Sequence, residues 1–389
     1  MRIATLQIAS KLGDVEENVK RADELLSKGI SILDGHGGDR ENVRAEDAKL
    51  DILVLPELAL TGYNFPSFEA IKPYLEPAGQ GRSAAWAHQT AKRLGCKVCI
   101  GYPEVEVGMG GNGQREEKYY NSLLVLDEQG NILLNYRKTF LYYTDETWAS
   151  EGSAELGFHQ LTFLNVKNSG SSRARSGGER AILSPAPQSQ YKMDKEIATS
   201  FGICMDINPY RFEAPYTAYE FAHRVLDSES QLVILSMAWL TLLSREELDA
   251  LAGKPEIDTF NYWIQRFMPL IRKQMNHSRN ADDSDANTSS TDAEKRIIIV
   301  FANRTGEEDG SPSPARYAGT STIVAVSQRQ PTTGSNTPGS GSSSDDERSP
   351  PLDVKILCWD MLGATEEGLC FADTAADPKM VFQLVSAGR

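Results

Sequence analysis

Short apolar runs recur along the chain, and they limit how it can fold. Residues 2–9, RIATLQIA, form one such run, and a segment follows in which Val15, Val19, Ala22 and Leu26 repeat at helical spacing. Asp14 stands where this helix should begin, with Glu17 as a capping-box partner. Apolar runs of this length are typical of strands buried in a sheet. Strands that alternate with amphipathic helices predict an α/β fold.

Further elements follow the same pattern. We expect strands at 51–57, 97–107, 196–204, 231–240, 296–306 and 318–326, and helices at 84–95, 214–230 and 260–276. Residues 122–138 predict a hairpin, because a turn at Asp127–Asn131 separates two apolar runs.

Three stretches break this pattern: 168–180, 278–294 and 328–351, which are low-complexity segments rich in Ser, Gly, Asn, Asp or Arg. Such compositions bury too little apolar surface to offset the entropy of ordering the chain. Because expected strands lie on both sides of the insertions, we interpret residues 1–389 as a single domain. Residues 352–389 are expected to form a C-terminal extension.

The charge balance excludes some classes of function. The formal net charge is −14, whereas a general nucleic-acid binder needs a basic surface, so no nucleic-acid partner is expected. The chain has no apolar run of 18 or more residues, which argues against a membrane span. The first residues lack the apolar core of a signal peptide and are too acidic for a mitochondrial transit peptide, so we expect a cytoplasmic protein.

The five cysteines do not suggest a disulfide framework. Cys96 and Cys99 form a CxxC, but neither a second CxxC nor a pair of histidines accompanies it. We therefore expect no metal site there, and interpret both as small apolar residues beside a buried strand.

Three of the expected strands end in a reactive or ionisable side chain. Glu57 follows LVLP, Lys138 follows ILLNYR, and Cys204 follows ATSFGI. Strand ends are where a rigid sheet can present side chains to a common cleft, and a buried charge there is costly unless it is paired. Together a thiol, a carboxylate and an ammonium are sufficient for amide hydrolysis.

The chemistry gives each group a role. A cysteine attacks as a thiolate, so a base must take its proton, and a carboxylate in an apolar pocket can do this. An ammonium can stabilise the oxyanion, together with a backbone N–H such as that of Met205. Spacing alone does not bring the three groups together. Taken singly, Cys204 could be a core cysteine, Glu57 a structural ion-pair member and Lys138 a surface charge.

The three strand ends resemble the motifs of the nitrilase superfamily, the carbon–nitrogen hydrolases: PE in LVLPELALTGY, YRK in NYRKTFLYYTDE and GIC-x-D in FGICMDINPYRFEAP. The resemblance runs from residue 3 to about residue 326. It implies a four-layer α-β-β-α sandwich that needs no cofactor, in which Glu57 is the general base, Lys138 stabilises the oxyanion and Cys204 is the nucleophile. It also implies a second carboxylate that holds Lys138. Glu146 fits that position, and Asp145 is equally near.

Two longer segments resemble one particular branch of this superfamily. YRKTFLYYTDETWASEG and GICMDINPYRFEAP are similar to the branch that deamidates N-terminal Asn and Gln, whereas most other branches have a shorter CYDxRFPE after the nucleophile. This implies release of ammonia and conversion of the terminal residue to Asp or Glu. In the N-degron pathway such a product is then arginylated and the protein degraded. The partners would be peptides and proteins that begin with Asn or Gln.

Such a substrate carries an α-amine with a pKa near 8, so a carboxylate should bind it. The candidates for substrate contact are Tyr63, Asp145, Glu146, Met205, Asp206 and Glu213. Trp148 could also line the substrate pocket. Each carboxylate could instead pair with a cation or accept backbone N–H bonds.

Two other functions are compatible with the sequence. The first is hydrolysis of a free small amide, as in an ω-amidase or a carbamoyl-amide hydrolase. The second is an inactive family member that serves as a scaffold, although all three motif positions are filled. Both a monomer and a homodimer are compatible with the sequence.

Overall fold

The computed structural model describes residues 1–33, 49–109, 111, 113–163, 195–275, 295–310, 314–329 and 353–383. The predicted insertions 168–180 and 278–294 lie outside the described residues, as does 330–351 of the third. Gln328 and Arg329, which were expected in that insertion, instead end a strand. The buried Gln328 amide donates to the carbonyls of Leu270 and Lys273, which explains why this polar residue belongs to the sheet.

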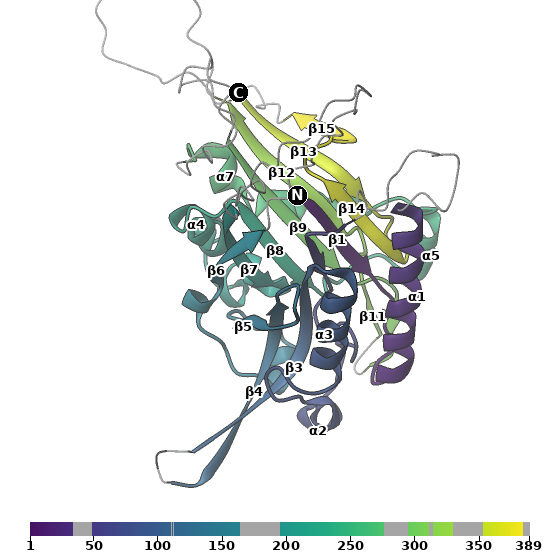
Figure 1. The fold of residues 1–389 in the computed structure, drawn as a ribbon, viewed down its shortest axis with the longest axis vertical. Helices are drawn as coiled ribbons and strands as arrows, with labels where there is room; N and C mark the ends of the chain where they lie inside the picture. The colour runs from purple at the N-terminus through teal and green to yellow at the C-terminus, as the bar shows by residue number, and fades with distance from the viewer. Residues whose placement is uncertain are drawn as a thin grey trace, which may run out of the picture.

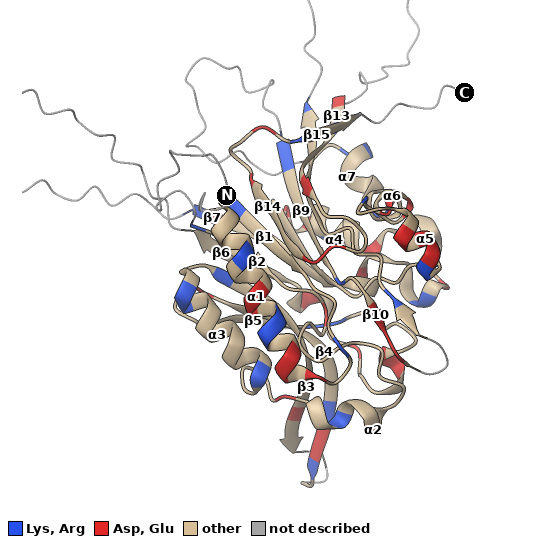
Figure 2. Cartoon of the chain, turned by 90° about the vertical axis from the view of Figure 1, so that its right-hand side faces the viewer, with Lys and Arg blue, Asp and Glu red and all other residues tan. Residues whose placement is uncertain are grey.

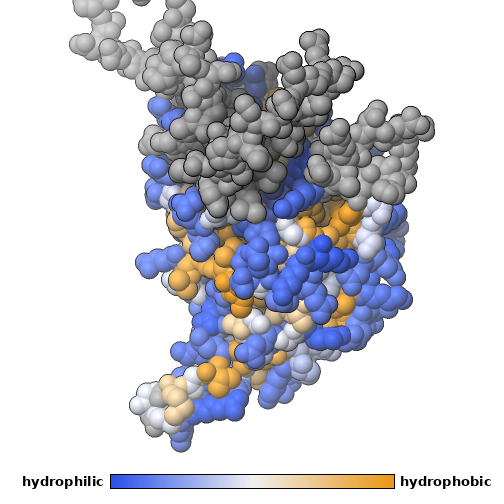
Figure 3. Space-filling view, viewed as in Figure 1, coloured by the Kyte–Doolittle hydropathy of each residue, from blue (hydrophilic) through white to orange (hydrophobic). Residues whose placement is uncertain are grey.

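One sheet has six strands in the order β14-β1-β2-β3-β4-β5. Its strands are β1 (Arg2–Gln7), β2 (Ile52–Val54), β3 (Lys97–Met109), β4 (Arg115–Leu126), β5 (Ile132–Arg137) and β14 (Gly368–Asp373). The neighbours β1, β2 and β3 run parallel, whereas β4, β5 and β14 pair antiparallel. The predicted hairpin is confirmed as β4–β5. Strands β3 and β4 continue beyond the sheet as an arm, which carries the exposed Val107 and Met109 (Figures 1 and 3).

The second sheet has seven strands in the order β15-β13-β12-β9-β8-β7-β6. Its strands are β6 (Phe158–Phe163), β7 (Lys195–Ile203), β8 (Leu232–Met237), β9 (Lys295–Asn303), β12 (Thr322–Arg329), β13 (Asp353–Met361) and β15 (Met380–Gln383). A short pair of strands, β10 (Glu307–Glu308) and β11 (Ala315–Arg316), stands apart from both sheets.

The side chains of β2 alternate between two hydrophobic cores, one on each face of the first sheet. Ile52 and Val54 of β2 pack in the core that includes the second sheet, whereas Leu53 packs beneath the outer helices. Those helices are α1 (Val15–Leu33) and α3 (Arg82–Leu94). The predicted end of α3 is confirmed, because Gly95 caps it in the left-handed conformation (φ 60°).

Helices also cover the outer face of the second sheet, so the molecule has the expected α-β-β-α layers (Figure 1). They are α4 (Glu220–Asp227), α6 (Ile257–Gln265) and α7 (Met268–Arg272), while α2 (Phe68–Ile71) and α5 (Arg245–Ala250) lie in connections. Figure 2 shows charged residues mainly on helices such as α1 and α5, whereas strands such as β1 and β2 are largely uncharged. Within the described residues, no helix has the length and apolar character needed to cross a bilayer.

The helix predicted at 260–276 is wrong in its length. The chain forms α6 and α7 with a break at Phe267, and Pro269 stands in the first turn of α7. A proline has no N–H to donate to the preceding turn, so it suits a helix beginning and interrupts a continuous helix.

The residues after 352 do not form an extension, as the sequence suggested, but supply strands to both sheets. Strand β14 pairs with β1, and β13 pairs with β12. Cys370 and Cys358, one on each of these strands, are buried. The C-terminal segment therefore completes the two-sheet core.

We predict that a chain ending at residue 351 will not fold, because it loses β13 and β14 and exposes an edge of each sheet. Of the elements that the structure describes, a chain ending at residue 379 loses only the edge strand β15, and it should retain a cooperative transition. Thermal unfolding followed by circular dichroism compares the two. A cooperative transition in the shorter chain would contradict the prediction.

Candidate active site

The strand ends that carry Glu57, Lys138 and Cys204 converge between the two sheets. Glu57 and Lys138 follow strands β2 and β5 of the first sheet, and Cys204 follows β7 of the second. The Nζ of Lys138 donates to the Oε1 of Glu57 at 2.5 Å. The Ala238 N–H donates to Glu57 Oε2 at 2.8 Å and is also a hydrogen-bond partner of the Cys204 thiol, so the thiol lies beside Glu57. The structure thus brings the three residues into one cluster.

A second carboxylate holds Lys138, and it belongs to Asp145. The Nζ of Lys138 donates to its Oδ2 at 2.6 Å, and Lys138, Glu57 and Asp145 are all 0% exposed. The Nδ2 of Asn121 bridges the two carboxylates, at 2.7 Å from Glu57 Oε1 and 3.0 Å from Asp145 Oδ1. Glu146, the other candidate from the sequence, is exposed. The short helix η3 (Asp145–Thr147) turns Asp145 inward.

Cys204 stands at a sharp turn between β7 and the short helix η5 (Cys204–Ile207). Its φ is 42°, in the left-handed region that residues with a side chain rarely adopt. Leu58, directly after Glu57, has a φ of 45°. The backbone is therefore strained directly after Glu57 and at Cys204, and strain of this kind is common at functional sites.

The pKa shifts describe a protonated thiol beside a buried base. Burial raises the pKa of Cys204, and the charge of Glu57 raises it further against the opposing effects of Lys138 and the Ala238 N–H. Burial also raises the pKa of Glu57, although Lys138 opposes this. Burial acts to lower the pKa of Lys138, but Asp145 and Glu57 outweigh it and raise the pKa. The ammonium therefore stays charged, and the thiol needs a base to become a nucleophile.

Asp206 has a structural position. Its Oδ1 accepts the N–H groups of Thr139 and Phe140, at 3.0 and 2.8 Å. Its Oδ2 accepts the N–H of Ile203 and the hydroxyl of Tyr136, at 2.7 and 2.8 Å. These four donors tie the turn at Cys204 to the segment after Lys138. They leave Asp206 little capacity to contact a substrate, which corrects its prediction as a substrate-binding residue.

The other predicted substrate residues fall into two groups. Tyr63, Met205 and Trp148 are buried, and the Tyr63 hydroxyl donates to Asp145 Oδ2 at 3.3 Å. Met205 directly follows Cys204 in the turn, and Trp148 packs in the same apolar cluster as Tyr63. Glu213, by contrast, is exposed to solvent and lies in the segment after η5.

Three groups at the site were not predicted. The N–H of Ala238 donates to Glu57 Oε2 at 2.8 Å. Glu308 accepts the Tyr63 N–H at 2.9 Å and pairs with the buried Arg304, so it fixes the loop that carries Tyr63. Asn121 is the third: it precedes the predicted hairpin by one residue, and its carbonyl accepts the Lys138 N–H at 2.8 Å. The other two depend on contacts between distant segments.

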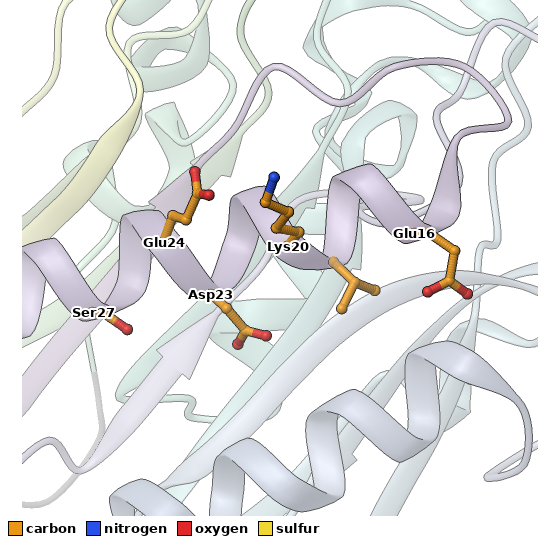
Figure 4. A pocket seen from close by; sticks show the side chains of 6 residues that line it. Glu16, Lys20, Asp23, Glu24 and Ser27 are labelled. Atoms are coloured by element: carbon orange, nitrogen blue, oxygen red, sulfur yellow. The ribbon is translucent and has the colours of Figure 1, made fainter.

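Two features of the chain lie apart from this cluster. Cys96 and Cys99 are buried in the first sheet, and burial raises the pKa of Cys96 to about 12. In the part of the chain that the structure describes, no group of His, Cys, Asp or Glu is arranged to hold a metal. A shallow groove lies along α1, and Glu16, Lys20 and Asp23 are among the residues that line it (Figure 4). None of its lining residues belongs to the Lys138 cluster.

Comparisons with known proteins indicate the family and the fold. Residues 2–163 match the carbon–nitrogen hydrolase family. A protein N-terminal amidase of Schizosaccharomyces pombe is 30% identical over 84% of this chain and 92% of its own length. The protein N-terminal amidase of Saccharomyces cerevisiae is 27% identical over 95% of this chain and 93% of its own. A crystal structure of an N-terminal amidase with a Gln-Gly peptide superposes with a TM-score of 0.62 at 23% identity, covering 95% of this chain and 96% of that one. The structural likeness confirms the expected fold.

We predict that Gly101→Ala will impair turnover through the backbone of Glu57. A Cβ at Gly101 would lie 2.7 Å from Glu57 Cα and 2.7 Å from the Pro56 carbonyl oxygen, so this backbone must shift. Displacing a catalytic group by about 1 Å can lower a rate by about 100-fold. Gly108→Ala, on the same strand with open space around it, is the matched control. Steady-state amide hydrolysis measures both, and equal kcat/KM for the two variants would contradict the prediction.

Proposed function

The chain belongs to the carbon–nitrogen hydrolase family, and we propose that it hydrolyses the side-chain amide of Asn or Gln at the N-terminus of peptides and proteins. The observation that carries the proposal is the buried ammonium of Lys138, held between two carboxylates beside the Cys204 thiol. The relatives that match along most of the chain support the substrate class, because both are protein N-terminal amidases.

In the first half of the reaction, Glu57 takes the proton of the Cys204 thiol, and the sulfur attacks the carbon of the side-chain amide. Lys138 and the N–H of Met205 stabilise the negative oxygen of the tetrahedral intermediate. Glu57 then gives its proton to the leaving nitrogen. The carbon–nitrogen bond breaks, ammonia departs, and a thioester joins the substrate to Cys204.

In the second half, Glu57 acts again as a base. It takes a proton from water, and the hydroxide attacks the thioester carbon. The carbon–sulfur bond breaks, and the proton returns to the sulfur. The substrate leaves with a carboxylate, as N-terminal Asp or Glu. The raised pKa of Glu57 suits both roles, because a base with a pKa nearer neutrality can also act as an acid.

Recognition of the α-amine needs a carboxylate with free capacity. Asp206 is occupied by four donors, and the Oδ2 of Asp145 already accepts Lys138, Tyr63 and a backbone N–H. Glu146 and Glu213 are exposed. We therefore propose that Glu146 and Glu213, and not the buried carboxylates, bind the α-amine of the substrate.

We predict that the enzyme will release ammonia from peptides that begin with Asn or Gln, and that Cys204→Ala will abolish this release without unfolding the protein. The alanine lacks the nucleophile but removes little volume from the core. Cys96→Ala, a buried cysteine outside the cluster, is the control and should retain activity. An ammonia-release assay with thermal unfolding of each variant gives both readouts.

Two further substrates test the specificity. A Gly-Asn peptide carries its amide one residue away from the amine, and free asparagine lacks the peptide that follows. We expect both to be poor substrates. Equal turnover of Gly-Asn would remove the N-terminal specificity, and a preference for free asparagine would favour the hydrolysis of small amides.

The dependence of kcat/KM on pH should be bell-shaped, with an acid limb and an alkaline limb. Glu57 must be ionised to take the thiol proton, so kcat/KM falls as pH falls through its pKa. Because burial raises that pKa, we expect the acid limb above the ordinary carboxyl value of about 4.3. The pKa of Lys138 is raised, so the alkaline limb should instead follow the substrate amine, near pH ~8.

Asp145→Asn tests the assignment of the acid limb. The charge of Asp145 raises the pKa of Glu57, so its removal should move the acid limb of the residual activity to lower pH. Glu155→Gln, at an exposed position on the short helix η4 (Ala154–Leu156), should leave that limb in place. An equal displacement in both variants would show that the limb does not report on Glu57.

A further inference from the structure

Two large aromatic side chains remain exposed beside the catalytic cluster. Tyr143 is 61% exposed and Phe212 is 46% exposed. Their ring centroids lie 6.0 Å apart, and both rings pack against Tyr142, at 5.0 and 6.4 Å. We call Tyr142, Tyr143 and Phe212 the aromatic patch. Contiguous exposed apolar groups of this kind commonly mark a binding surface.

The patch is built from the two segments that carry the nucleophile and the ammonium. Tyr142 and Tyr143 follow Lys138, and Phe212 follows Cys204. The N–H of Tyr142 donates to Asp145 Oδ2 at 3.0 Å, and the same oxygen accepts the Lys138 ammonium at 2.6 Å. The backbone of Tyr142 therefore lies within two hydrogen bonds of the Lys138 Nζ.

Burial decreases outward along the patch. Lys138 and Asp145 are fully buried, Tyr142 is half-buried, and Tyr143 and Phe212 are exposed. Burial raises the pKa of Tyr142, and the charge of Cys204 raises it further, which agrees with a ring close to the thiol. The patch thus leads from the buried Lys138–Asp145 pair to the solvent.

The backbone that holds Phe212 at the surface is strained. Arg211 and Phe212 are consecutive residues in the left-handed region, with φ of 53° and 56°. The Phe212 N–H donates to the Pro209 carbonyl at 2.9 Å. Tyr210 packs its ring on Phe140 at 5.0 Å, which fixes this turn against the segment after Lys138. Strained positions that the surroundings maintain are concentrated at functional sites.

We propose that the aromatic patch binds the side chain of the substrate's second residue and makes the enzyme favour a large apolar or aromatic residue there. This proposal rests on the proposed function, because the side-chain amide of the first residue must lie at Cys204. One residue of extended chain spans about 3.3 Å, so the second residue must lie close to the catalytic cluster. Tyr142, whose N–H donates to Asp145 Oδ2, places the aromatic patch beside that cluster. The group on the patch is the second residue of the substrate, because that residue is covalently bonded to the Asn or Gln at Cys204.

The test compares kcat/KM for the peptides Asn-Phe-Ala, Asn-Gly-Ala and Asn-Lys-Ala, measured by ammonia release. With the wild-type enzyme we expect Asn-Phe-Ala to exceed Asn-Gly-Ala by about five-fold, the size of effect that aromatic pairing typically gives. Phe212→Ala should bring this ratio close to one, whereas Phe212→Tyr, which keeps the ring, should retain it. Phe158→Ala replaces a phenylalanine of similar exposure on β6 and should leave the ratio unchanged.

Each other outcome overturns the proposal in a distinguishable way. Equal wild-type turnover of the three peptides would remove the second-residue preference and leave the proposed function intact. A preference for Asn-Lys-Ala would mean that surface carboxylates, and not the rings, select the second residue. Loss of the ratio in Phe158→Ala as well would show a general effect of removing a phenylalanine. No turnover of any of these peptides would overturn the proposed function together with this inference.

Discussion

An ammonium that is wholly removed from water imposes the strongest constraint on this structure. Burying one charge costs several kcal/mol unless partners compensate it. Lys138 meets this requirement with Glu57 on one side and Asp145 on the other, and Asn121 bridges the two carboxylates. The strand ends and the η3 turn must therefore come together for the interior to be stable. The same arrangement places a base and a cation beside the Cys204 thiol.

The surrounding structure keeps these groups in place by using backbone donors. Asp206 joins the turn at Cys204 to the segment after Lys138 through three backbone N–H groups. Glu308 fixes the loop of Tyr63 in the same manner, with Arg304 as its buried counter-ion. Carboxylates in such positions act on the geometry of the site and not on the substrate. This explains why Asp206, two positions after the nucleophile, is a poor candidate for binding the substrate amine.

The two sheets contribute unequally to the chemistry. The first presents Glu57 and Lys138 from β2 and β5, and the second presents Cys204 from β7. A change in how the sheets pack would separate the thiol from its base. The C-terminal strands β13 and β14 reinforce this packing, because each joins a different sheet. The active site consequently depends on residues far from it in the sequence.

The sequence by itself determined the local elements and the order of the reactive residues. Apolar periodicity is a local property, so it located β1, α3 and the β4–β5 hairpin, and the motifs around Glu57, Lys138 and Cys204 indicated the family. Only the tertiary structure decided that Asp145, and not the adjacent Glu146, holds Lys138, because a short helical turn directs one of them inward. It likewise decided that Asp206 is occupied by the backbone and that the C-terminal residues complete both sheets. The choice of Asp145 depends on how a short turn is oriented, and the other two outcomes depend on hydrogen bonds and strand pairings between distant segments. No local sequence pattern encodes either.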